Sequence, residues 1–320
     1  MQDLLRRFAG VLLLAAPLVA AAQTYPAKAV RMMVPFPPGG ATDIIGRLVA
    51  AKMQEVWSQP VVIENRAGAG TVVGTDYVAK AAADGHTLGF VVTAYVINPS
   101  LRADLPYDTL RDLAGVTQVS VQHLVMAAHP SLEANSIAEL IALAKKNPGK
   151  LAYATPGSGT AMHLSVELLK TTAGIDLVHV PYKGGAPAQQ DVVSGHVPIL
   201  MDVLYAVQPL IQSGRIKVLA LLSPQRAPES PGYPVVAEAV PGVSALSLVG
   251  IVTPAATPRD LVHRIGADIA RAVKSSDLNG RMKQQGMEPV GSTPEAFDAL
   301  IRAEIDKWAK VVKASGAKAD

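Results

Sequence analysis

Apolar runs of strand length alternate with helical patterns in the first hundred residues. The apolar runs are residues 30–36 (VRMMVPF), 61–64 and 88–93. The first two are separated by a helical pattern, whose apolar face is Ile45, Leu48, Val49, Met53 and Val56. A second helical segment, residues 72–82, separates the last two. This order of strand, helix, strand, helix and strand predicts a parallel sheet with right-handed crossovers.

The middle of the chain repeats this alternation, although no sequence repeat is visible. One helix begins at Ser136, where Glu139 completes a capping box, and another is predicted over residues 186–194. Strands are predicted at residues 124–128, 177–180, 197–201 and 216–222. An alternative for the last of these strands is that it runs back to the first lobe. The middle segment therefore predicts a second α/β unit.

The last part of the chain adds one strand, residues 246–252, and two helices that open at Thr257-Pro258 and Thr293-Pro294. These helices need a sheet to cover, and the first sheet is available to them. The chain therefore divides into a discontinuous first domain of residues 23–124 and 223–320, and a second domain of residues 125–222. Two crossings between the domains form a hinge, with a ligand cleft between the two lobes.

Three turns follow the predicted strands, at the edge where open parallel sheets bind ligands, and the first two contain glycines. In the first domain these turns are residues 36–43, 68–71 and 93–95. Gly39 and Gly40 lack the GxGxxG spacing of a dinucleotide site, and no GK[ST] follows to make a phosphate loop. The alternative is that these glycines serve tight turns only.

Residues 153–169 (YATPGSGTAMHLSVELL) pass from a short apolar run through small residues into an amphipathic helix. Small residues let a ligand approach the backbone closely. The first turn of a helix has N–H groups without intrahelical partners, and its dipole favours an anion. We therefore predict that this turn holds a carboxylate and that the other lobe closes over it.

Composition narrows the function classes. The chain has 320 residues, 49% hydrophobic and 17% charged, which is enough for about two folded domains. A net charge of +3 without a Lys/Arg block argues against nucleic-acid binding. The absence of cysteine excludes a lipid anchor, thiol catalysis and zinc–thiolate sites.

The N-terminus has the features of a cleaved signal peptide, residues 1–22. Arg6 and Arg7 precede an apolar run of twelve residues, 8–19, and Ala20-Ala21-Ala22 provides a cleavage signal. An N-terminal membrane anchor and a twin-arginine signal are the alternatives. The expected location of the mature protein is the periplasm, where it is soluble.

Five segments in order resemble the periplasmic solute-binding proteins of tripartite tricarboxylate transporters, also called the Bug (Bordetella uptake gene) family. They span nearly the whole mature chain: VPFPPGGATDIIGRLVA (34–50), VVIENRAGAG (61–70), YATPGSGTAMHL (153–164), LVHVPYKGGAPAQQDVVSGHV (177–197) and AEIDKWAKVVKASG (303–316). The resemblance implies an α/β type II periplasmic-binding-protein fold with two lobes, a hinge and an interlobe cleft. It also implies capture of a small carboxylate and delivery to membrane permease subunits. We further predict a monomer without cofactor, metal or catalytic activity.

By position, the ligand loops of that family correspond to residues on both sides of the expected cleft. The candidate ligand-binding residues are Phe36, Gly39, Gly40, Thr42, Asp43, Gly70, Thr71, Thr93, Thr155, Gly157, Ser158, Gly159, Thr160, His163, Tyr182, Lys183, Gly184 and Asp202. Thr71 departs from the family, which often has glycine there, and either contacts the ligand or narrows the cleft. The ligand itself is not predicted beyond its carboxylate.

Several candidates have more than one reading. His163 and Glu167 share a helix face, but a metal site needs further ligands, so a His that orients the 157–160 turn is favoured. Ser158 lies in G-S-G rather than GxSxG, which leaves a secreted hydrolase as a lesser alternative. Lys183 either pairs with a ligand carboxylate, is solvated, or bonds across the hinge. Asp202 either accepts from an amino or hydroxyl group or holds a loop, and Asp43 is favoured as a helix cap. A receptor that presents its ligand to a sensor kinase is a further alternative.

Overall fold

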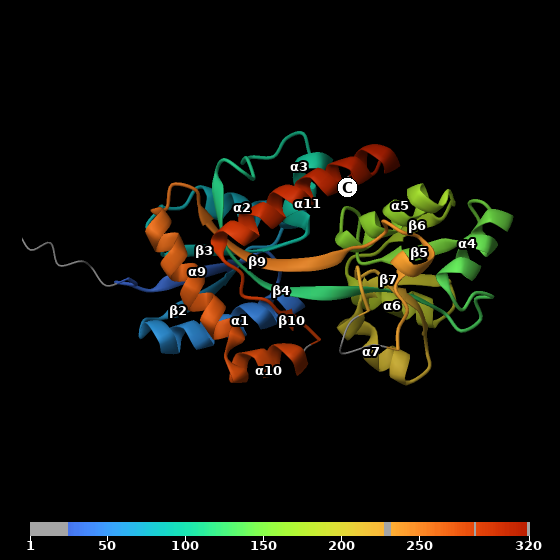
Figure 1. Ribbon diagram of the computed structural model, residues 1–320, viewed down its shortest axis with the longest axis horizontal. Helices are drawn as coiled ribbons and strands as arrows, with labels where there is room; N and C mark the ends of the chain where they lie inside the picture. The colour runs from blue at the N-terminus through green and yellow to red at the C-terminus, as the bar shows by residue number, and fades with distance from the viewer. Residues whose placement is uncertain (1–24, 227–231, 285, 319–320) are drawn as a thin grey trace, which may run out of the picture.

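The computed structural model describes residues 25–226, 232–284 and 286–318, so the predicted signal peptide lies outside the described residues. Two α/β lobes lie side by side along the long axis of the molecule (Figure 1). A single mixed sheet runs through both lobes in the order β2-β1-β3-β9-β4-β7-β5-β6, and β8 and β10 also pair with β4.

The first lobe contains the parallel strands β1 (Val30–Val34), β2 (Val61–Asn65) and β3 (Thr87–Val92), which confirms the predicted alternation. Its helices are α1 (Ala41–Trp57), α2 (Val72–Ala79), α3 (Ala94–Leu101), α9 (Arg259–Lys274), α10 (Ser276–Gln284) and α11 (Pro294–Ser315), with the short 3₁₀ turn η1 (Ala69–Thr71) before α2. The predicted apolar face of α1 is buried at Ile45, Val49 and Met53, but Val56 is 48% exposed and Trp57 is buried instead.

The second lobe contains β5 (Ala152–Thr155), β6 (Val178–Pro181) and β7 (Ile199–Val203), with β5 parallel to both neighbours. Its helices are α4 (Ile137–Lys146), α5 (Ala161–Ala173), α6 (Gly185–Val193), α7 (Leu204–Gln212) and the short α8 (Val236–Ala239). β8 (Lys217–Leu221) pairs with β4 inside this lobe, so the option that it runs back to the first sheet is wrong. α8 packs against α4, so the chain stays with this lobe beyond residue 222. The exact lobe boundaries remain a prediction.

Two long antiparallel strands join the lobes, β4 (Leu113–Ala128) and β9 (Leu246–Pro254) (Figure 1). The prediction found only the end of β4, since its first part contains polar residues; a two-residue strand, β10 (Glu288–Pro289), pairs with this part. α11 forms a third connection, because it packs on α3 in the first lobe and on α5 in the second. None of the helices in the described ranges has the length and apolar character needed to cross a membrane.

Candidate functional site

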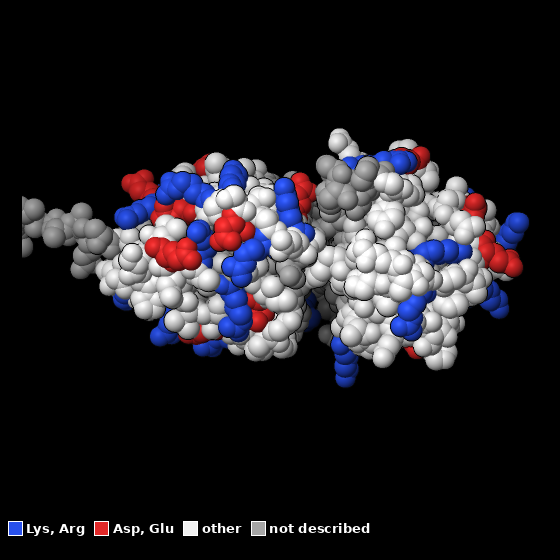
Figure 2. Space-filling model, turned by 90° about the horizontal axis from the view of Figure 1, so that it is seen from below, with Lys and Arg blue, Asp and Glu red and all other residues white. Residues whose placement is uncertain are grey.

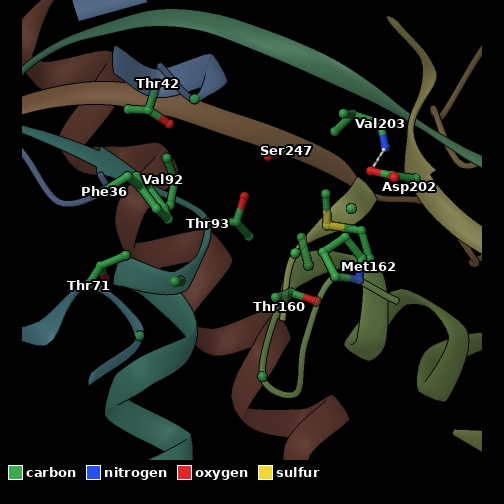
Figure 3. Close-up of a pocket in the computed structure, with 18 of the residues that line it drawn as sticks. Phe36, Thr42, Thr71, Val92, Thr93, Thr160, Met162, Asp202, Val203 and Ser247 are labelled. Atoms are coloured by element: carbon green, nitrogen blue, oxygen red, sulfur yellow. Dashed lines mark hydrogen bonds between the residues drawn. The ribbon is translucent and has the colours of Figure 1, made fainter. Parts of the chain in front are cut away.

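A cavity of about 800 Å³ lies between the lobes. Its walls come mainly from the segments that follow β1, β2, β3, β5, β6 and β7, which all leave the sheet at carboxyl ends of strands. Figure 3 shows Thr42, Thr71 and Thr93 on one side of this space and Thr160, Met162 and Asp202 on the other. On one face, a narrow indentation separates the lobes, and charges of both signs are more frequent over the first lobe (Figure 2).

The cavity brings together two thirds of the predicted site residues. Those that line it are Phe36, Gly40, Thr42, Gly70, Thr71, Thr93, Ser158, Gly159, Thr160, Lys183, Gly184 and Asp202. The residues that do not line it are Gly39, Asp43, Thr155, Gly157, His163 and Tyr182. Most of these six instead hold the loops that do.

Asp43 is buried beneath the first wall. Its carboxylate accepts hydrogen bonds from Gly39 N at 2.9 Å, Arg47 Nε at 2.9 Å and Asn65 Nδ2 at 2.9 Å. The N-cap of α1 is Gly40, without a side-chain cap bond. Asp43 is therefore not the N-cap: it reaches back from the first turn and fixes the loop before α1.

On the second wall, Tyr182 turns away from the cavity, and its hydroxyl donates to Asp191. Thr155 Oγ1 contacts His179 Nε2 at 2.7 Å and receives a hydrogen bond from Gly157 N at 3.3 Å. These contacts shape the turn between β5 and α5 from behind.

His163 confirms the favoured reading of a residue that orients the turn. Gly159 N donates to His163 Nδ1 at 3.1 Å, and the His163 ring stacks on His179 with centroids 3.9 Å apart. The N–H of Gly159 therefore already has an acceptor within the protein.

The open donors lie one step further along the chain. Thr160 caps α5 by accepting from His163 N at 3.2 Å, and the first intrahelical bond is from Leu164 N to the Thr160 carbonyl. The N–H groups of Ala161 and Met162 therefore have no acceptor among the described residues, and both residues line the cavity. The helix start remains the anion-binding feature, with a shifted pair of donors.

The first wall is formed by the loop of Pro37 and Pro38 and by the starts of α1 and α3. Thr93 forms the N-cap of α3, but its Oγ1 accepts from Leu248 N at 3.0 Å. The Thr93 hydroxyl thus ties the end of β3 to the joining strand β9.

The charged lining of the cavity, over the described ranges, consists of Arg102, Lys183 and Asp202. Neither cation forms an ion pair with a described carboxylate. Arg102 lies beside Gly70, where a Cβ would be 3.4 Å from Arg102 Nη2, and Asn98 Nδ2 donates to the Gly70 carbonyl at 3.0 Å. Asp202 is 2% exposed, and burial raises the pKa of its carboxyl group.

Sequence reasoning missed Asn98, Arg102, Gln122, Gln189 and Ser247, which also line the cavity. Asn98 and Arg102 escaped because α3 contains Pro99 and was not predicted as a helix. A signal was present in the sequence: an amide and a cation, Asn98 and Arg102, lie four residues apart in the segment that follows the polar end of β3.

The alternative chemistries find no support in the geometry. Ser158 has no hydrogen bond to a described base, and Nδ1 of the nearby His163 is occupied by Gly159 N. Within the described ranges, no group of three or more His, Asp or Glu side chains has the arrangement of a metal site.

Residues 45–317 match the profile of the tripartite tricarboxylate transporter family receptor. The chain belongs to this family. The receptor is 38% identical to the protein BugT of Bordetella pertussis over 308 residues, which are 95% of this chain and 94% of that one.

Solved structures agree with this assignment. The Rhodopseudomonas palustris protein Rpa4515, solved with adipate, is 34% identical with a TM-score of 0.82, over 92% of this receptor and 100% of that chain. MatC from the same organism, solved with bound malate, is 29% identical with a TM-score of 0.78, over 90% and 100%. The predicted family and the two-lobed binding-protein fold are thus confirmed.

Proposed function

We propose that this receptor captures a small carboxylate in the periplasm by closure of its lobes and delivers it to the permease subunits of a tripartite transporter. The observation that carries the proposal is the pair of cations, Arg102 and Lys183, that face the cavity without a described carboxylate partner. An anionic ligand would form ion pairs with both cations. The relatives solved with adipate and malate support the same ligand class.

The energetics are adequate for reversible capture. Micromolar affinity requires about 8 kcal/mol. Hydrogen bonds to charged groups contribute about 1.5–3 kcal/mol each. Bonds from Arg102, Ala161 N and Met162 N would supply that affinity after the cost of closing the lobes. A ligand that contacts both walls favours the closed form because it binds that form more tightly.

The proposal is tested by thermal unfolding of the protein from Gln23 onward against small carboxylates and their methyl esters. A ligand that binds only the native state raises the melting temperature. We expect stabilisation by at least one free acid and none by its ester. No shift with any acid, together with no retained small molecule in mass spectrometry of the denatured protein, would contradict carboxylate capture.

Arg102→Met provides the matching variant. We expect it to weaken binding of the stabilising acid by about ten- to a hundredfold, because one charge-assisted contact is lost. Arg281→Met is the control, since Arg281 is exposed on α10, outside the cavity. Calorimetric titration of both variants separates a site effect from a general effect of charge.

A further inference from the structure

Asp202 occupies an unusual position for a carboxylate in a site that binds anions. It is the next-to-last residue of β7, is 2% exposed, and lines the cavity. Its Oδ1 accepts from Val203 N at 2.8 Å, and its Oδ2 accepts from Gln189 Nε2 at 2.9 Å. No Lys, Arg or His of the described chain forms an ion pair with it. Its neighbours are thus neutral donors, one from the backbone and one from the side chain of Gln189.

This arrangement fixes which end of the Gln189 amide faces the cavity. An ionised carboxylate only accepts hydrogen bonds, so the amide nitrogen of Gln189 must face Asp202. The amide oxygen then lies on the opposite side. Gln189 is half-buried and lines the cavity, and its Oε1 accepts no hydrogen bond within the part of the chain that the structure describes.

The backbone at Gly185 packs closely against the Asp202 carboxylate. A Cβ at Gly185 would be 2.9 Å from Asp202 Oδ2 and 3.3 Å from Gln189 Nε2. The start of α6 therefore packs directly on the Asp202–Gln189 contact. This packing leaves little room for a ligand to reach Oδ2, whereas Gln189 remains partly exposed. Asp202 acts through Gln189, as a positioning residue.

We propose that Gln189, oriented by Asp202, is a specificity-determining residue that selects carboxylates bearing a hydroxyl or amino hydrogen-bond donor. This inference rests on the proposed function, since it concerns the same cavity. Such a donor satisfies Gln189 Oε1, whereas an unsubstituted acid, or one with an oxo group at that place, covers this acceptor without giving it a hydrogen bond.

The test compares acids of equal length by calorimetric titration: succinate, malate and oxaloacetate, and glutarate, 2-hydroxyglutarate and 2-oxoglutarate. We expect the receptor to bind the hydroxy acid of at least one series about tenfold more tightly than the other two acids. In Gln189→Leu this ratio should fall to about one, while the unsubstituted acid still binds. Gln190→Leu, an exposed neighbour outside the cavity, should keep the original ratio.

Asp202→Asn gives a result that a merely structural role would not produce. Val203 N still needs an acceptor, so the new amide oxygen faces it and the new amide nitrogen faces Gln189. Gln189 must then turn its oxygen toward Asn and present Nε2 to the cavity. We therefore expect the oxo acid to bind this variant about as tightly as the hydroxy acid, because both groups accept from Nε2, while the unsubstituted acid stays weaker.

The outcomes separate the two proposals. If none of the acids binds the unmodified receptor, the proposed function fails for small carboxylates and the inference fails with it. If hydroxy, oxo and unsubstituted acids bind equally, or if Gln189→Leu keeps the preference, the inference is overturned while carboxylate capture stands. Melting temperatures without ligand show whether each variant is folded, and the partly exposed Gln189 makes Gln189→Leu the safer variant.

Discussion

Several residues that do not line the cavity fix the loops that do. Asp43 gathers Gly39 N, the Arg47 guanidinium and the Asn65 amide around one buried carboxylate. Burial by itself raises the pKa of Asp43, but these three donors outweigh it and hold the pKa at about 2. His163 has a similar role behind Gly159. Both residues fix a loop whose backbone faces the ligand space.

Because of Asp43, we expect the folded protein to become less stable as the pH falls. The pKa of Asp43 is lower in the folded protein than the ordinary value of 3.8, so its stabilising effect is complete above that value. The effect is lost as the pH falls toward about 2. We expect Asp43→Asn to lower the free energy of unfolding by about 1–3 kcal/mol at neutral pH, because donors lose an acceptor. The difference from the unmodified protein should shrink between pH ~4 and ~2.

Urea denaturation across this pH range measures that difference. Because other carboxylates titrate in the same range, only the gap between the two proteins is informative. Asp306→Asn is the control, since Asp306 is exposed on α11 and should give no gap at any pH. A gap for Asp43→Asn that persists unchanged at pH ~2 would show that its carboxylate is not the stabilising group.

At the scale of elements, helix starts supply the donors of the site. α1, α3, α5, α6 and α7 all begin at the cavity. Thr160 caps α5 and also donates to the Gly157 carbonyl at 2.8 Å, so one side chain fixes both the helix start and the preceding turn. Its loss should therefore affect binding as well as stability.

Ser136 allows a matched comparison, because it caps α4 through the same kind of bond, from Glu139 N at 3.2 Å, outside the cavity. We expect Thr160→Ala and Ser136→Ala each to lower the free energy of unfolding by about 0.5–2 kcal/mol. Only Thr160→Ala should weaken binding of the stabilising acid, by about tenfold. Equal affinities in the two variants would mean that the start of α5 does not hold the ligand.

Elements with regular periodicity were predictable from the sequence, and those with mixed patterns were not. The buried strands β1, β3 and β7 read as plain apolar runs, and the capping box at Ser136 located α4. The first part of β4 contains buried polar residues such as Thr117 and Ser120, so it has no apolar run. α3 contains Pro99, which does not fit a helical pattern. Because α3 was not predicted, Arg102 and Asn98 were not predicted as site residues. The sequence located the turn at Gly159 and the helix that carries His163, but the hydrogen bond between these residues depends on a side-chain contact that spacing does not fix.

At the scale of the whole molecule, three elements connect the lobes: β4, β9 and α11 (Figure 1). Two of them are paired strands, which can bend together at one hinge. α11 adds a further contact between the lobes, because it packs on α3 and on α5. If the lobes close on a ligand as proposed, we expect α3 of the first lobe to meet the start of α5 in the second.

Gly159 and Leu101 meet at that place. A Cβ on Gly159 would be 2.8 Å from Leu101 Cδ1, so a side chain at this position would collide with the opposite lobe. Gly159 has φ +71 and Gly174, at the other end of α5, has φ +62 with open space around it. Alanine at either position costs about 1–2 kcal/mol of backbone strain. Only Gly159→Ala adds the clash.

We therefore expect Gly159→Ala and Gly174→Ala to lose similar stability, while Gly159→Ala alone binds the stabilising acid at least tenfold more weakly. Small-angle X-ray scattering should show that ligand reduces the radius of gyration of Gly174→Ala but not of Gly159→Ala. Leu101→Ala added to Gly159→Ala removes the obstructing methyl groups and should restore both affinity and closure. If the double variant stays as weak as Gly159→Ala, the defect lies in the turn itself, and the contact between the lobes does not control closure.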